Sequence, residues 1–202
     1  MKENLERRNY GTGELKIEQR NESQVNTIIG HAAVFNSLSE DLGGFVEQIS
    51  EGAFDNVLTD DVRALFNHNQ NFVLGRTVSN TLRLSVDEQG LRYEIDIPNT
   101  SVGNDLLESI SRGDISQSSF GFIVGEDEWE KTENGNLRTI TKVERLYDVS
   151  PVTYPAYPET NAAVRSMENW TKEKNKESLV DEEKDLIERD LKKLKTVIKS
   201  KY

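Results

Sequence analysis

The sequence predicts an α+β protein in which short β-strands dominate and a charged helical segment follows them. Between about residues 25 and 164, short apolar runs with alternating side chains are separated by turn residues. After about residue 178, apolar residues recur at helical spacing within a highly charged segment. Many closely spaced strands are typical of a β-barrel or a β-sandwich.

Several segments are predicted as strands, and turn residues connect some of them as hairpins. In TLRLSV and LRYEIDI the apolar residues alternate, which places them on one face of each strand. The segment from Asp87 to Gly90 is predicted to join these two strands, and Asn134-Gly135 predicts a second hairpin between EDEWEKT and LRTITKV. The other predicted strands are TIIGHAAVF, GFVEQI, VRALF, NFVLGRTV and ISQSSFGFIV.

Helices are fewer. One is predicted with Ser101 as its N-cap, ending at Gly113 in the left-handed conformation, and Gly52 to Leu58 predicts a short helical turn. From about Ser178 to Ser200 an amphipathic helix or short coiled coil is predicted, joined to the rest by the polar NWTKEKNKES. Its apolar face would carry Leu179, Ile187, Leu191, Leu194 and Ile198.

These patterns predict three segments. They are a polar N-terminal segment (1–24), a β-barrel domain (25–166), and a charged linker with an amphipathic helical tail (167–202). A chain of 202 residues suits one domain with an appendage.

The composition excludes several classes of function. With 25 basic and 36 acidic residues the formal charge is −11, which disfavours nucleic acid or an anionic membrane as the main partner. The chain has no cysteine and only two histidines, which excludes disulfides, thiolate chemistry and a histidine-rich metal site. We expect neither a bound metal nor a cofactor. No apolar stretch has the length of a signal peptide core or a membrane span, so we expect a soluble, non-exported protein.

Two histidines are the candidates for a general base. His31 lies in an apolar strand among small residues, which favours a structural role. His68 follows a short apolar run and stands between Asn67 and Asn69 at the end of a strand. Such a histidine is a structural residue, a metal ligand or a general base, and the residue type alone does not decide.

Hydroxyl and carboxyl candidates lie further along the chain. Ser116, Ser118 and Ser119 occur in ISQSSFGF, a run that otherwise looks buried, where Gly121 predicts the close approach of another backbone. Asp148 stands at the start of an apolar strand in RLYDVSPVTYPAYPET. Each signal alone also fits a buried hydroxyl or a carboxylate that caps a turn.

Taken together, several blocks resemble, in order and spacing, the HK97-type phage prohead (procapsid maturation) protease family. These blocks are GHAAVFN, EGAF, ALFNHN, LGRT, LRLSVDEQGLRYEIDIPNT, ISQSSFGF and LYDVSPVTYPAYPET, and they cover roughly residues 28 to 164. The resemblance implies a fold like that of herpesvirus assemblin, a mostly antiparallel β-barrel ringed by a few helices. It also implies a serine endopeptidase in which His68 is the general base, Ser119 the nucleophile and Asp148 the third catalytic residue.

Two positions leave alternatives open. Gln117-Ser118 stands where the family usually has a small-apolar pair, so Ser118 is a rival nucleophile. Glu144 lies close to Asp148 in the sequence and is a rival third residue, although Asp148 is preferred. His31 falls where the family commonly has an aromatic residue, which again favours a structural role.

The resemblance also implies substrates and a location. The substrates would be the scaffold protein or the scaffold-like N-terminal segment of the major capsid protein. The polar segment from Arg165 to Ser178 is expected to be exposed and unstructured, so we also expect the protease to cleave itself there. The helical tail would dock on scaffold or capsid protein or pair with another copy. The protein would reside in the host cytoplasm and be packaged inside the procapsid, or stay cytoplasmic if it comes from a prophage.

Two other classes of function fit the sequence less well. A non-enzymatic procapsid protein would be expected to lack one of the three catalytic residues, and none is missing. A β-barrel binding module of the OB type is disfavoured by the acidic charge and by the lack of a basic aromatic face.

Overall fold

The computed structural model describes residues 5–9, 15–19, 25–133, 135–154 and 163–174, together with Lys176, Lys184, Ile187 and Arg189. The chain divides into two compact units, Met1–Ala162 and Ala163–Tyr202. Strands dominate the described part of the first unit, which also contains the helix α1 (Ser101–Ser111). The predicted α+β class with a majority of strands is therefore confirmed.

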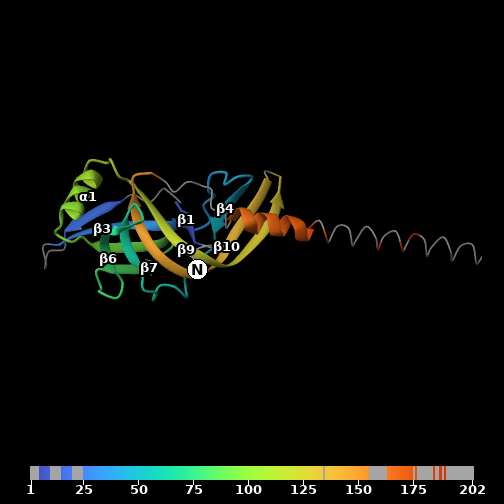
Figure 1. The fold of residues 1–202 in the computed structure, drawn as a ribbon, viewed down its shortest axis with the longest axis horizontal. Helices are drawn as coiled ribbons and strands as arrows, with labels where there is room; N and C mark the ends of the chain where they lie inside the picture. Colours follow the sequence, from blue (N-terminus) through green and yellow to red (C-terminus); the bar gives the residue numbers. More distant parts are fainter. Residues whose placement is uncertain are drawn as a thin grey trace, which may run out of the picture. The chain divides into compact units, whose positions relative to one another are not determined.

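The strands of the first unit form two sheets (Figure 1). The six-stranded sheet has the order β1 (Glu6–Arg8), β9 (Gln117–Thr132), β10 (Gly135–Val152), β5 (Arg63–Phe66), β6 (Asn69–Arg76), and β4 (Phe45–Ile49) also pairs with β10. The four-stranded sheet has the order β2 (Lys16–Gln19), β3 (Asn26–Val34), β8 (Gly90–Asp96), β7 (Leu82–Val86). The pairings are antiparallel except that β4 and β5 run parallel to β10.

Two strands are much longer than the sequence predicted. The part of ISQSSFGFIV from Gln117 onward and EDEWEKT form the single strand β9, and LRTITKV continues through Asp148 as β10. The predicted hairpin between them is present, with Gly135 opposite Thr132, although Asn134 itself lies outside the described residues. Register shifts along this pair accompany its strong curvature in Figure 1.

The predicted helix is present, but its N-cap is one residue earlier than expected. Thr100 has extended backbone angles, and its side chain accepts a hydrogen bond from the Gly103 amide. Thr and Ser are both good N-caps, so the adjacent Thr100 and Ser101 left the position of the N-cap undecided in the sequence. Gly113 takes a φ of +80° after the helix, as predicted. The segment Gly52 to Leu58 forms successive turns with hydrogen bonds three residues apart.

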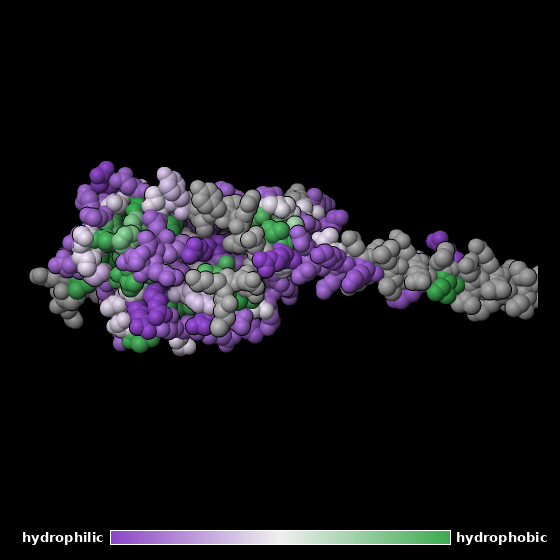
Figure 2. Space-filling view, viewed as in Figure 1, coloured by the Kyte–Doolittle hydropathy of each residue, from purple (hydrophilic) through white to green (hydrophobic). Residues whose placement is uncertain are grey.

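One hydrophobic core joins the two sheets. It combines Ile28 and Tyr93 of the four-stranded sheet with Phe120 and Phe122 of β9, all fully buried. Phe120 and Phe122 stack with ring centroids 4.5 Å apart. On the face drawn in Figure 2 the surface is mainly hydrophilic, with small separate hydrophobic patches. Because Phe120 and Phe122 face the core, the residues that alternate with them, Ser119 and Gly121, face the other side of β9.

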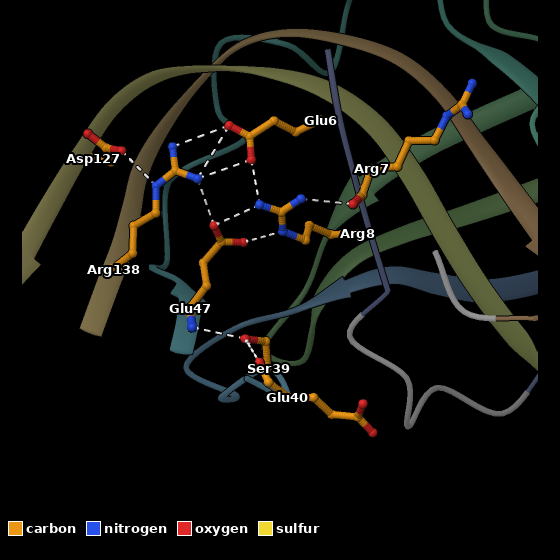
Figure 3. A network of polar contacts seen from close by, with 8 residues as sticks. All are labelled: Glu6, Arg7, Arg8, Ser39, Glu40, Glu47, Asp127 and Arg138. Atoms are coloured by element: carbon orange, nitrogen blue, oxygen red, sulfur yellow. Dashed lines mark hydrogen bonds and ion pairs between the residues drawn. The ribbon is translucent and has the colours of Figure 1, made fainter. Parts of the chain in front are cut away.

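The N-terminal segment contributes a strand with buried charges, which its polar composition did not predict. Glu6 and Arg8 of β1 contact Glu47 of β4 and Arg138 of β10 (Figure 3). Arg138 lies 2.8 Å from Glu47 and 3.0 Å from Glu6, and all four side chains are at most 3% exposed. Burial opposes the charge of Arg138, but Glu6 and Glu47 outweigh it and raise the pKa of Arg138. These ion pairs tie β1 to β4 and β10.

The second unit differs from the sequence expectation. The polar segment from Arg165 to Ser178 was expected to be unstructured, but residues 163–174 are helical. The segment contains no Gly or Pro, and Arg, Met, Glu and Lys are good helix formers. The predicted amphipathic helix from Ser178 to Ser200 lies almost entirely outside the described residues. In the described part of the chain, no helix combines the length and the apolar character needed to cross a bilayer.

Candidate active site

His68 lies in the tight turn between β5 and β6 rather than at a strand end. Phe66 pairs with Asn69, which leaves Asn67 and His68 as a two-residue turn, and both have a φ of +54°. Two-residue hairpin turns of this kind need positive φ at both positions, and Asn and His are among the residues that tolerate it. The side chain of His68 is only 8% exposed.

The turn is attached to the end of β10. The backbone amide of Asn67 donates to the Pro151 carbonyl at 3.0 Å. The side-chain oxygen of Asn67 accepts from the Thr153 amide at 2.8 Å. Since β5 runs parallel to β10 in this region, the turn reaches the part of β10 that follows Asp148. This attachment brings His68 close to β10.

Ser119 and Asp148 lie on neighbouring strands of the same sheet. In the β9–β10 register, Ser119 is opposite Ser150 and Gly121 is opposite Asp148. Directly opposed residues and residues two apart share a face, so all four lie on the face opposite to the Phe120 side chain. Ser119 is fully buried and Asp148 is 6% exposed.

The three predicted catalytic residues are connected by two hydrogen bonds. His68 Nε2 lies 2.7 Å from Ser119 Oγ, and His68 Nδ1 lies 2.5 Å from Asp148 Oδ1. An ionised carboxylate only accepts hydrogen bonds, so this arrangement assigns the proton of the neutral imidazole to Nδ1. The Nε2 lone pair then faces the Ser119 hydroxyl, which donates to it. This is the geometry of a nucleophile, a base and an orienting acid.

The rival residues lie elsewhere. Ser118 Oγ lies 2.7 Å from the Tyr93 hydroxyl on the core face, where burial raises the pKa of Tyr93 and keeps its phenol neutral. Glu144 is exposed on β10, and the carboxylate bonded to His68 is that of Asp148. His31 Nε2 lies 2.9 Å from Asp87 in the four-stranded sheet, away from this cluster.

Two residues of the site were missed or misread in the sequence. Ser150 donates to Asp148 Oδ1 at 2.8 Å. Gly121 was expected to admit a backbone, but it admits the Asp148 side chain, because a Cβ at residue 121 would lie 2.5 Å from Asp148 Oδ2. The signal for Ser150 was the spacing in Asp-Val-Ser, which places both polar residues on one face of a strand.

The comparison with protein families identifies the chain. The sequence model of the caudovirus prohead serine protease family matches residues 13–173. The chain belongs to the caudovirus prohead serine protease family. The resemblance to prohead proteases drawn from the sequence blocks is therefore confirmed, and at the family level the protein is a serine protease of phage capsid maturation.

The fold of this prohead protease is also similar to a solved structure. That structure is the capsid assembly protease gp21 of bacteriophage T4, with a TM-score of 0.51 and 12% sequence identity. The similarity covers 75% of this chain and 98% of that chain, and it shows a common fold. No curated protein sequence matches the chain. Among the described residues, no group of three or more metal-ligating side chains is arranged to hold a metal ion.

Proposed function

We propose that this prohead protease is an endopeptidase that uses Ser119 as nucleophile, His68 as general base and Asp148 as orienting carboxylate. The observation that carries the proposal is the hydrogen-bonded chain from Ser119 Oγ through both nitrogens of His68 to Asp148. The low exposure of all three side chains supports it further, because charges act more strongly where water is excluded.

The reaction follows from the positions of the protons. As Ser119 Oγ attacks the scissile carbonyl, its proton passes to His68 Nε2, and Asp148 stabilises the resulting imidazolium. Collapse of the tetrahedral intermediate breaks the peptide bond, and His68 returns the proton to the leaving amine. A water molecule then attacks the acyl group on Ser119, with His68 again taking and returning a proton, which releases the second product.

The substrates we propose are the scaffold protein or the scaffold-like N-terminal segment of the major capsid protein, and the protease itself. The family supports this choice, because it consists of prohead proteases. The protein would be made in the host cytoplasm and enclosed in the procapsid, where confinement raises the local concentration of enzyme and substrate. A formal charge of −11 favours basic or neutral substrate surfaces.

Self-cleavage in the helical part of the second unit would require local unwinding. A protease active site accepts extended backbone, whereas residues 163–174 are helical. We therefore propose that self-cleavage is slower than cleavage of the capsid or scaffold substrate, and that it follows opening of this helix.

Co-expression of the protease with the capsid protein of the same phage tests the proposal. With Ser119→Ala, gels of purified procapsids should show uncut capsid subunits and full-length protease, because loss of the nucleophile typically costs about 10⁶ in kcat. Ser118→Ala is the matched control, and it should process both proteins. If Ser119→Ala processes them normally, the serine protease assignment to this site is wrong.

A further inference from the structure

Ser150 occupies a position that the proposed reaction does not yet use. It lies on β10 two residues after Asp148 and directly opposite Ser119 on β9. All three side chains therefore share one face of the sheet. Ser150 is fully buried, so water does not compete for its hydroxyl.

The Ser150 hydroxyl is bonded to Asp148 Oδ1, the same carboxylate oxygen that is bonded to His68. Ser150 Oγ donates to Asp148 Oδ1 at 2.8 Å, and the same oxygen lies 2.5 Å from His68 Nδ1. Ser150 Oγ also lies 3.3 Å from His68 Nδ1. Asp148 Oδ1 thus accepts from two donors at once.

The other oxygen of the carboxylate is restricted by sterics. Asp148 Oδ2 occupies the space beside Gly121, where a Cβ would lie 2.5 Å from it. The χ2 torsion of aspartate has a broad energy profile, so rotamer preference alone does not fix the orientation of the carboxylate. Its orientation must therefore come from its neighbours, and Ser150 is a neutral donor that holds Oδ1.

We propose that Ser150 is a positioning residue of this active site. Its hydroxyl fixes the Asp148 carboxylate so that Oδ1 faces His68 Nδ1, and this keeps the Nε2 lone pair of His68 directed at Ser119. The activity part of the test rests on the proposed function, whereas the spectroscopic part rests on the hydrogen bonds alone.

Ser150→Ala in the full-length protein is the test variant, and Ser118→Ala is its matched control. Ser118 is also a buried serine on the neighbouring strand, but it bonds Tyr93 on the core face. Ser150→Thr retains a hydroxyl and serves as the rescue variant. Ser150→Cys, which has a similar shape and only a weak donor, replaces Ser150→Ala if that variant does not fold.

Two measurements are made on each variant. The first is the low-field proton NMR resonance of His68 Nδ1–H, which is simple to assign because the chain has two histidines. The second is the rate of phosphonylation by an alkyl fluorophosphonate, a reagent that reacts with activated serines. In that reaction Ser119 Oγ bonds to phosphorus, fluoride leaves, and the Ser119 proton passes to His68 Nε2.

In Ser150→Ala the resonance should shift or broaden, and the maximal rate of phosphonylation should fall about 10-fold or more, with little change in the reagent concentration for half-maximal rate. Ser118→Ala should change neither, and Ser150→Thr should restore both. An unchanged resonance and rate in Ser150→Ala would overturn the proposal. A third outcome is that the wild-type protein is not phosphonylated, while the His68 Nδ1–H resonance still differs between wild type and Ser150→Ala. In that case the positioning role stands and the proposed function fails.

Discussion

At the scale of single residues, the histidine bonded to Ser119 has a left-handed backbone conformation. His68 and Asn67 both have a φ of +54°, which costs a non-glycine residue of the order of 1 kcal/mol. Asn67 donates a hydrogen bond to Pro151 and accepts one from the Thr153 amide, and these bonds offset the cost and hold the turn against β10. The turn therefore determines where the imidazole lies.

Asn67→Ala should affect both stability and activity. The variant loses the side-chain bonds to Thr153 and tolerates positive φ less well, so the free energy of unfolding should fall by about 1–2 kcal/mol. Phosphonylation of Ser119 should slow as His68 moves. Asn80 is a matched control, since its φ is +57° in the turn before β7. Asn80→Ala should lose stability in urea unfolding but keep the phosphonylation rate; equal rate losses in both variants would contradict this role of Asn67.

Gly121→Ala should remove activity with little effect on the rest of the fold. The new methyl group would overlap Asp148 Oδ2 and displace the carboxylate from His68. A displacement of about 1 Å in such a site can cost about 10² in rate, which phosphonylation kinetics would detect. The control is Gly125→Ala on the same strand, where the nearest atoms are 3.3–3.4 Å away. A Gly121→Ala variant as active as Gly125→Ala would show that the contact is not needed.

The sequence predicted which residues lie together in the hydrogen-bonded cluster better than it predicted their local contacts. Residue type alone did not decide whether His68 is a structural residue, a metal ligand or a general base. The order of the sequence blocks shared with the family distinguished His68 from His31. A backbone was predicted to approach Gly121, whereas the group beside it is the Asp148 side chain. A glycine in a strand indicates a close approach but does not reveal which group approaches. Ser150 was missed because Asp-Val-Ser shows only that the two polar residues share one face of a strand. It does not show that the Ser150 hydroxyl bonds the Asp148 carboxylate.

At the scale of elements, the β7–β8 hairpin contains a carboxylate that organises its turn. Asp87 accepts hydrogen bonds from the Gln89 and Gly90 amides at 2.9 and 3.0 Å, and from His31. Partial burial opposes its charge, but the bonds from His31, Gly90 and Gln89 outweigh it, so the pKa of Asp87 lies below its usual value of 3.8. The ionised carboxylate therefore stabilises the folded hairpin.

The stabilisation by Asp87 depends on pH in a defined direction. Because the folded pKa is lowered, the contribution of Asp87 is complete above its unfolded pKa and is lost as pH falls through the lower folded value. Asp87→Asn should lower the melting temperature at pH 7, and the difference from wild type should shrink below about pH 4. Melting curves from pH 7 to pH 2.5 measure it. A difference that stays constant with pH, or a slower phosphonylation of Ser119, would contradict this role.

Elements with alternating apolar residues were predicted well, whereas β1 was not. The buried charges of β1 depend on partners far away in the sequence, 39 residues from Arg8 to Glu47 and 132 residues from Glu6 to Arg138. A buried charge is tolerated only with such partners, so Glu-Arg-Arg looks like an exposed segment until they are known. The length of β9 and β10 was also missed, because charged residues in the middle of each strand look like a connection.

At the scale of the whole molecule, the tail provides a test of assembly separate from catalysis. The sequence from Glu177 to Tyr202 is rich in charged residues and contains the predicted apolar face, and we expect this segment to dock on scaffold or capsid protein or on another copy. Deleting them should leave the melting temperature and phosphonylation rate of the protease nearly unchanged but lower its copy number in procapsids. Unchanged incorporation, measured by quantitative gels of purified procapsids, would contradict the targeting role.

We propose that one serine of this chain, Ser119, is activated by one histidine, His68. The direct measurement is labelling of the full-length protein with an alkyl fluorophosphonate, followed by peptide mass spectrometry. A single adduct on Ser119 is predicted, absent in Ser119→Ala and His68→Ala and retained in Ser118→Ala and His31→Ala. An adduct on Ser118, or labelling that persists in folded His68→Ala at the wild-type rate, would contradict the claim.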